Sequence, residues 1–293
     1  MASAELSESD LAFLKDAADF FENPSFLLQV ANIFGMPLQK ITEALPQAVA
    51  AVVDAALKEA LRIAVDTVGG QASDATLEES YKASGWSGLW HRVAATATGG
   101  VGGAFGLAGL AIELPVTTGI IFRSIASTAQ EFGEDISDPE VRLDCLSVLA
   151  YGGPSKKDDA MDASYLSARL AMTTMIREAA AFLAKPGTAT VADAVAAGTA
   201  PALIRLIGVI SNRFGIVVSE KMIAQSLPVF SVLTGATINN AFAGHFNAAA
   251  QYHFGIRKLE KRFGAEAVQS RYRLLAKTMK LPGDSELGLP KPS

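Results

Sequence analysis

Charged residues and cysteines are scarce in this chain of 293 residues. Lys, Arg, Asp and Glu make up 19% of the sequence, against 50% hydrophobic residues, which lies at the apolar end for a soluble protein. Cys145 is the single cysteine, which excludes an intrachain disulfide and a cysteine-based zinc site. We therefore expect a reducing, cytoplasmic environment and helices that are deeply buried or in contact with a membrane.

The chain also lacks a basic surplus. Its net charge of −5 argues against nucleic-acid binding, which usually needs excess Lys and Arg to neutralise phosphates. Residues 1–9 show no positive segment followed by an apolar run, so we expect no secretory signal.

Motifs of common catalytic sites are missing as well. There is no Gly-x-Ser-x-Gly elbow, no Gly-Lys-Ser/Thr phosphate loop and no His-Glu-x-x-His. The three histidines, His91, His245 and His253, favour hydrogen-bonded structural roles, since a metal site would need distant partners such as Glu113 or Glu134 with His245. We expect no metal and no cofactor.

Helix-forming patterns fill most of the chain. Ala, Leu, Lys, Glu and Met dominate the periodic segments and no alternating strand pattern is found, so we predict an all-α, multi-helix bundle. Ser7 and Ser9 precede the first helix as candidate N-caps, and Asp138 is an expected N-cap with Pro139 at the first helical position. The helices are predicted over residues 10–21, 26–34, 46–68, 114–132, 141–150, 165–184, 200–214, 217–226, 228–243 and 245–263.

A glycine-striped apolar segment, residues 98–124, is the most distinctive feature. We predict a central glycine-rich apolar helical hairpin there, with Pro115 restarting its second helix. Gly99, Gly103 and Gly106 let another backbone approach closely, which offers a surface for a homo-oligomer. Residues 103–122 are also long enough to cross a bilayer, so a buried hairpin, a membrane span and peripheral membrane contact all stay open.

A few polar residues interrupt the apolar helices and require partners, because an isolated charge in a low-dielectric interior costs several kcal/mol. Glu113 is the main example. We predict a ligand-binding or buried polar cluster from these residues, with Glu131, Glu134 and Asp135 pairing with Arg142 or Arg123. The members of the predicted cluster are Glu113, Arg123, Glu134, Asp135, Glu220, Lys221, Asn239, Asn240 and His245.

Charge is distributed unevenly between the two ends of the chain. The first 23 residues hold six carboxylates and one lysine, whereas residues 253–280 hold eight Lys or Arg. Both stretches fit solvated helical faces. The C-terminal stretch also fits a basic helix on an anionic membrane surface, with Lys258, Lys261, Arg271 and Arg273 as the membrane contacts.

Three regions are expected along the chain. Residues 1–85 form an N-terminal helical region, residues 86–280 form the principal helical domain, and residues 281–293 form a disordered tail rich in proline.

Several blocks of sequence resemble the EcsC protein family. They include Gly102-Gly-Ala-Phe-Gly-Leu-Ala-Gly-Leu-Ala-Ile-Glu-Leu-Pro-Val-Thr-Thr118, Cys145-Leu-Ser-Val-Leu-Ala-Tyr-Gly-Gly153 and Gly235-Ala-Thr-Ile-Asn-Asn240. The resemblance spans Trp86 to Tyr272. It implies a bacterial, cytoplasm-facing accessory role, because the family is named for a protein encoded beside an ABC transporter whose loss affects secretion. It brings no catalytic residues with it.

Two main functions are therefore expected, and a third, a scaffold that dimerises through Gly99–Gly109, stays open. The first is a cytoplasmic accessory protein, peripheral to the inner face of the cell membrane, that binds a membrane lipid, a membrane protein or an apolar ligand. The alternative is a hydrolase, with or without a metal, that uses Glu113 and His245 as catalytic residues.

Overall fold

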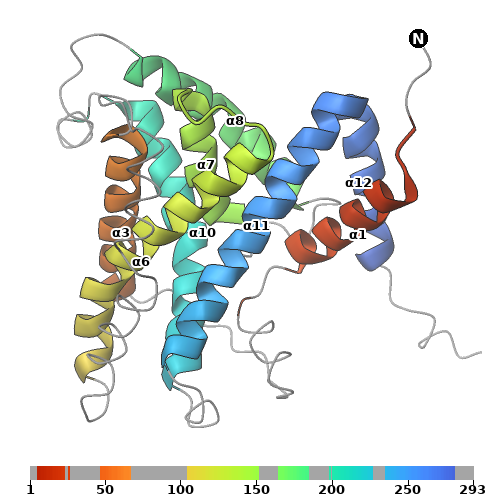
Figure 1. The fold of residues 1–293 in the computed structure, drawn as a ribbon. Helices are drawn as coiled ribbons and strands as arrows, with labels where there is room; N and C mark the ends of the chain where they lie inside the picture. Colours follow the sequence, from red (N-terminus) through yellow and green to blue (C-terminus); the bar gives the residue numbers. More distant parts are fainter. Residues whose placement is uncertain are drawn as a thin grey trace, which may run out of the picture.

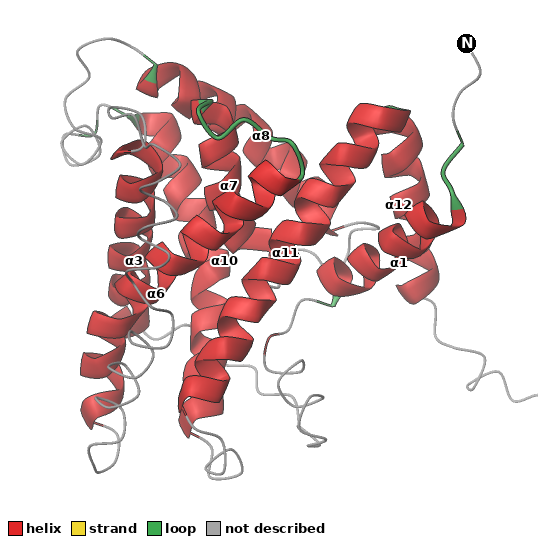
Figure 2. Ribbon diagram, viewed as in Figure 1, coloured by secondary structure: helices red, strands yellow, loops and turns green. Residues whose placement is uncertain are grey.

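Eight α-helices and no strand make up the part of the chain that the structure describes. The computed structural model describes residues 5–23, 26, 47–66, 104–151, 164–184, 198, 200–226 and 235–280. The prediction of an all-α multi-helix bundle is confirmed (Figures 1 and 2). The helices are α1 (Glu8–Glu22), α3 (Gln47–Asp66), α6 (Ala104–Glu131), α7 (Pro139–Tyr151), α8 (Ser164–Leu183), α10 (Pro201–Ser226), α11 (Gly235–Phe263) and α12 (Ala265–Lys280).

Helix starts follow local capping signals. Ser7 and Asp10 form a capping box at the start of α1, in which the Ser7 side chain accepts from the Asp10 N–H and the Asp10 carboxylate accepts from the Ser7 N–H. Asp138 Oδ1 accepts from the Glu140 N–H at 2.8 Å, and α7 begins at Pro139. The Asp138 cap is confirmed, and of the two serines before the first helix Ser7 is the N-cap.

Three predicted helix breaks are wrong. α6 begins at Ala104 and continues through Pro115, although the proline leaves the Ala111 carbonyl without its helical N–H. α10 continues through Gly215, and α11 through Gly244. Burial of residues on both sides of each position favours one continuous helix, because packing outweighs a local cost of about 1 to 3 kcal/mol.

The predicted glycine-rich hairpin, with its second helix restarting at Pro115, is not confirmed. Residues on both sides of Pro115 belong to one continuous helix, and Gly106 lies in the first turn of that helix. Gly99 and Gly103 lie outside the described residues. The role of these glycines in self-association stays a prediction.

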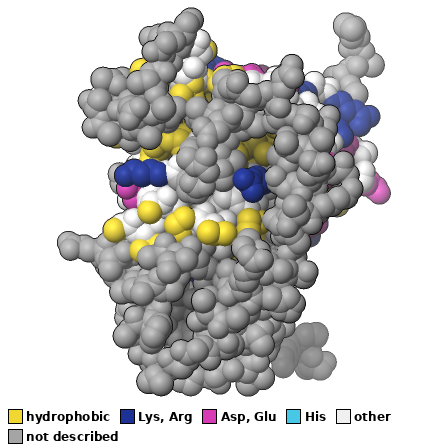
Figure 3. Space-filling view, turned by 60° about the vertical axis from the view of Figure 1, so that its left-hand side comes forward, with side chains coloured by type: hydrophobic (Ala, Val, Ile, Leu, Met, Phe, Trp, Pro, Cys, Tyr) yellow, Lys and Arg dark blue, Asp and Glu magenta, His cyan; other side chains and the backbone are white. Residues whose placement is uncertain are grey.

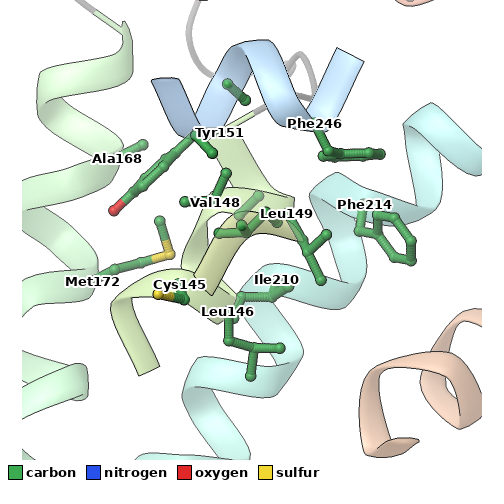
Figure 4. Packing of buried hydrophobic residues seen from close by; sticks show 14 of the residues in the cluster. Cys145, Leu146, Val148, Leu149, Tyr151, Ala168, Met172, Ile210, Phe214 and Phe246 are labelled. Atoms are coloured by element: carbon green, nitrogen blue, oxygen red, sulfur yellow. The ribbon is translucent and has the colours of Figure 1, made fainter. Parts of the chain in front are cut away.

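α7 lies at the centre of the bundle. All of its residues from Val141 to Tyr151 are buried, and it packs against α3, α6, α8, α10 and α11. Figure 4 shows Cys145 pointing toward Met172 of α8, while Leu149 points toward Phe214 of α10. On a helix buried on every side an unpaired polar group is costly, and among its described, buried side-chain atoms only Arg142 Nη2 and the Tyr151 hydroxyl lack a hydrogen-bond partner.

α1 and α12 pack together at one end of the bundle, beside the C-terminal half of α11 (Figure 1). Gly264, with φ of +91°, ends α11 and lets the chain reverse into α12. Tyr272 of α12 is fully buried, and its hydroxyl donates to Glu22 Oε1 at 3.1 Å. The acidic and basic stretches at the two ends of the sequence are therefore neighbours in space.

Apolar side chains also reach the surface. Figure 3 shows the side on which α3 lies, where hydrophobic side chains form a band across the described surface. One described segment, Pro201–Lys221 of α10, is long and apolar enough to cross a membrane, and half of it is buried within the protein. Since Lys221 is itself fully buried, the segment also has the burial of a core helix.

Candidate functional site

A buried histidine joins α7, α8 and α11. His253 has no exposed surface, and both of its ring nitrogens have partners. Nε2 lies 3.0 Å from Asp144 Oδ2, and Nδ1 lies 2.8 Å from the Tyr165 hydroxyl. Because an ionised carboxylate only accepts, Nε2–H donates to Asp144 and Nδ1 accepts from Tyr165. The ring of Tyr151 stacks on His253 at 4.9 Å.

Arg257 extends this arrangement by one helical turn. Its Nη1 donates to Asp144 Oδ2 at 2.8 Å, while Nε and Nη2 donate to the two oxygens of Glu134 at 2.9 and 3.1 Å. Lys261 Nζ lies 2.9 Å from Glu134 Oε1. These fork-shaped, charge-assisted bonds fasten the turn between α6 and α7 to α11.

A second ion pair lies about one turn further along α11. Arg169 of α8 binds both oxygens of Glu260, at 3.0 and 2.6 Å, and Gln269 of α12 donates to Glu260 at 2.8 Å. We call the set Asp144, His253, Tyr165, Arg257, Glu134, Lys261, Arg169 and Glu260 the ionic network. It connects α7, α8 and α11 with the turn between α6 and α7, and Gln269 joins α12 to it.

The charges of the ionic network balance when His253 is neutral, since three carboxylates face three cations. Burial lowers the pKa of His253 below its usual value and outweighs the attraction of Asp144. Burial alone would raise the pKa of Asp144, but the bonds from His253 and Arg257 hold it well below its usual range. Glu134 follows the same pattern, with Arg257 and Lys261 lowering its pKa against burial.

This geometry holds the helices together and leaves no free catalytic group on His253. Both imidazole nitrogens are bonded within the protein, so neither can take a proton from a substrate. Burial raises the pKa of the adjacent Cys145 thiol, which keeps it protonated and a poor nucleophile. Among the described residues, no group of three His, Cys, Asp or Glu is placed to hold a metal ion.

The predicted polar cluster is only partly brought together. Glu134 belongs to the ionic network, and its partners are Arg257 and Lys261 rather than the expected Arg142 or Arg123. Arg142 is buried on α7, where burial lowers its pKa.

The remaining predicted residues lie elsewhere. Asp135, Arg123 and Asn240 are exposed, which removes them from a buried cluster. Glu220 is half-buried, and the side chain of Glu113 lies outside the described residues. Since Glu113 and Arg123 are ten residues apart in one continuous helix, their backbones are separated by about 15 Å along its axis, too far for a direct pair.

A second buried polar region surrounds Phe242 in the other half of α11. Lys221 is fully buried, with Nζ 4.7 Å from the centre of the Phe242 ring. Asn239 lies one turn before Phe242 and is 3% exposed. His245 is also buried, against the rings of Phe20, Phe26 and Phe246. Because His245 precedes His253 by eight residues, it lies about 12 Å away along the helix axis.

Sequence reasoning missed most of the ionic network. Asp144 is a carboxylate within an apolar run, so the argument applied to Glu113 also applies to Asp144. Arg257 lies in the basic C-terminal stretch that fits a solvated face, yet all three of its guanidinium nitrogens donate to Glu134 or Asp144. No local pattern marks Tyr165 as a partner for a histidine 88 residues away.

The predicted membrane-surface residues are all exposed. Lys258, Arg271 and Arg273 reach solvent, and Lys261 does so while its ammonium group pairs with Glu134. On α12, Arg271, Leu274 and Lys277 recur every third residue and are exposed, while Val268, Tyr272 and Ala276 are buried. α12 therefore has a core face and a cationic outer face, which we define by Arg271, Arg273, Leu274 and Lys277.

Fold and site together define an all-α bundle protein with an ion-paired core. The chain belongs to the EcsC protein family, whose model matches residues 18–259. This match confirms the resemblance from Trp86 to residue 259 and extends it to the second half of α1 and to α3, while the expected end at Tyr272 lies beyond the match. No curated protein and no solved structure matches the chain. The family match ends within α11, so all of α12 lies beyond it.

Proposed function

We propose that this chain is a non-catalytic accessory protein that binds an anionic membrane surface through the cationic outer face of α12. One observation carries the proposal. Arg271, Arg273 and Lys277 surround an exposed Leu274 on a helix whose opposite face is fixed to the protein. Cations around an apolar side chain suit a bilayer interface with negatively charged headgroups.

The distribution of charge supports this choice of partner. The whole chain carries −5, but α12 holds four Lys or Arg and one Glu. Arg257 and Lys261, which are close in sequence, are engaged with Glu134. The cations of the outer face of α12 have no described ion-pair partner, so their field is directed outward toward an approaching surface.

The position of α12 in the chain fits an accessory role. Because α12 lies beyond the family match, its cationic face adds a feature to the part shared with the family. The implied association of the family with an ABC transporter supports work at the inner face of a cell membrane. A cytoplasmic location with peripheral membrane contact is the form that we propose.

The described geometry gives the hydrolase alternative no support. His245 is 3% exposed and lies among aromatic rings, and His253 has both nitrogens bonded. A general base needs a ring nitrogen that a substrate can reach. We therefore propose binding without a reaction.

Flotation with vesicles tests the proposal. The wild-type protein should float with vesicles containing phosphatidylglycerol at low salt, and should stay at the bottom with phosphatidylcholine alone. The triple variant Arg271→Glu, Arg273→Glu, Lys277→Glu should bind the anionic vesicles roughly a hundredfold more weakly, at about 1 kcal/mol per lost cation. High salt should weaken wild-type binding, because the contacts are exposed.

A matched control changes the net charge equally at distant sites. Lys58→Glu, Arg123→Glu and Arg177→Glu alter exposed cations on α3, α6 and α8, where single surface ion pairs contribute at most about 1 kcal/mol. This control should float like wild type. Equal loss in both triple variants, or no wild-type binding, would overturn the proposal.

A further inference from the structure

We infer that Leu274 enters the bilayer, so that the proposed membrane site selects anionic membranes with loosely packed headgroups. This inference rests on the proposed function. It goes further because it names an anchoring residue and a physical state of the membrane, which charge alone does not specify.

Leu274 differs from the other exposed apolar side chains of the described part. Val116, Leu170, Ile204 and Leu274 are 42%, 75%, 38% and 57% exposed. Only Leu274 has a cation three residues before it and another three residues after it, which places it between two positive charges on one side of the helix. Such cations bind headgroups while the leucine points between them.

α12 cannot turn its leucine inward. Val268, Tyr272 and Ala276 are fully buried against the protein. Tyr272 is bonded to Glu22 of α1, and Gln269 is bonded to Glu260 of α11. These contacts fix the orientation of α12, so the exposed Leu274 side chain points away from the protein. Penetration is therefore shallow and limited to Leu274, with the cations at the level of the headgroups.

A single inserted leucine gives a modest and measurable gain. Complete burial of a leucine side chain in an apolar phase accounts for roughly a ten- to hundredfold change in affinity, and a side chain that is already partly covered and inserts only shallowly gains less. Leu274→Ala should therefore weaken binding by about three- to tenfold. Loosely packed lipids expose more apolar area between headgroups, so unsaturated vesicles should bind more tightly than saturated ones of equal charge.

The native chain is well suited to site-specific labelling. Its one cysteine, Cys145, is fully buried and its thiol pKa is raised by burial, so a maleimide should leave the folded wild-type protein unlabelled. Leu274→Cys labelled with an NBD maleimide then reports on this one position. Ala51→Cys is the control, since residue 51 is exposed on α3, on the side of the molecule away from α12 (Figure 1).

With phosphatidylglycerol vesicles, NBD emission at position 274 should shift to the blue and gain intensity, and emission at position 51 should not change. Leu274→Ala should lose affinity as stated while its unfolding midpoint stays at the wild-type value, which separates binding from folding. If wild type floats but the probe at 274 behaves like the probe at 51 and Leu274→Ala binds normally, insertion is overturned and the membrane proposal stands. If wild type does not float, both are overturned.

Discussion

At the scale of single residues, the ionic network is held by its protonation states. His253 is neutral because a second positive charge beside Arg257 would be uncompensated in a buried site. Asp144 stays ionised because two donors share its Oδ2 atom. A buried network of this kind is stable only while every member keeps its partner.

The stability of the protein should therefore depend on the protonation of His253. Its folded-state pKa lies below the unfolded value of about 6.5, so the unfolded chain binds more protons. The unfolding free energy should rise with pH below about 6.5, by at most about 1.4 kcal/mol per pH unit for one proton. Above that range the contribution is constant.

The variant His253→Gln isolates this effect, because glutamine donates and accepts without titrating. Urea unfolding at pH 5, 6, 7 and 8 should show a smaller pH dependence in the variant than in wild type. The comparison concerns the slope, so a lower overall stability of the variant does not affect it. Identical slopes would show that His253 titrates equally in the folded and unfolded states.

At the scale of elements, α1 packs closely against α11 where Phe13 lies over Gly255. A Cβ atom at Gly255 would overlap the tip of the Phe13 ring, so the ring would have to move. Phe13 also contacts Tyr252 of α11 at 5.6 Å between ring centres. Phe13, Gly255 and Tyr252 thus determine how closely the two helices approach.

Gly255→Ala should couple energetically to Phe13. In a helix interior, Gly→Ala normally raises the free energy of unfolding by about 0.5 to 1 kcal/mol. We expect this gain for Gly244→Ala, because a Cβ atom there meets nothing within 4 Å. Gly255→Ala should not stabilise the wild-type protein, because its Cβ meets the Phe13 ring. It should stabilise the Phe13→Ala variant, in which that ring is absent. Urea unfolding of the double-mutant cycle should give a coupling of about 1 to 2 kcal/mol. Additive effects of the two substitutions would show that Phe13 and Gly255 are not coupled.

At the scale of the whole molecule, the early helices share one core with the later ones. α3 packs against α6, α7 and α10, and α1 packs against α8, α11 and α12. Buried residues from all described helices form one hydrophobic cluster. The division at residue 85 stays a prediction, and this packing gives a direct way to test it.

Heating should therefore unfold the described helices together. Leu57 of α3 is 1% exposed, so Leu57→Ala should lower the free energy of unfolding by about 2 to 5 kcal/mol. A single calorimetric transition should move to a lower midpoint temperature. The exposed control Lys58→Ala should change stability by less than about 1 kcal/mol. Two transitions, of which Leu57→Ala moves only one, would instead support a boundary near residue 85.

Local sequence was sufficient for the helical content and for many helix ends. Ser7, Asp138 and Pro139 act within a few residues of themselves, so capping chemistry predicts the starts of α1 and α7 to within about two residues. The continuation of α6 through Pro115 was not predictable in this way. It depends on the burial of Leu114, Thr117 and Ile121 against other helices.

For the polar residues too, part of the outcome follows from the sequence and part only from the tertiary structure. The scarcity of charge in an apolar chain already implied that buried ionisable groups must have partners. Which partners they have was decided only by the packing of α7 against α8 and α11, which brings Asp144 to a histidine 109 residues away. The sequence determined that α12 is amphipathic and basic. The tertiary structure decided that Arg257 and Lys261 turn to Glu134, while Arg271, Leu274 and Lys277 face outward, because a helix presents only one side to the core.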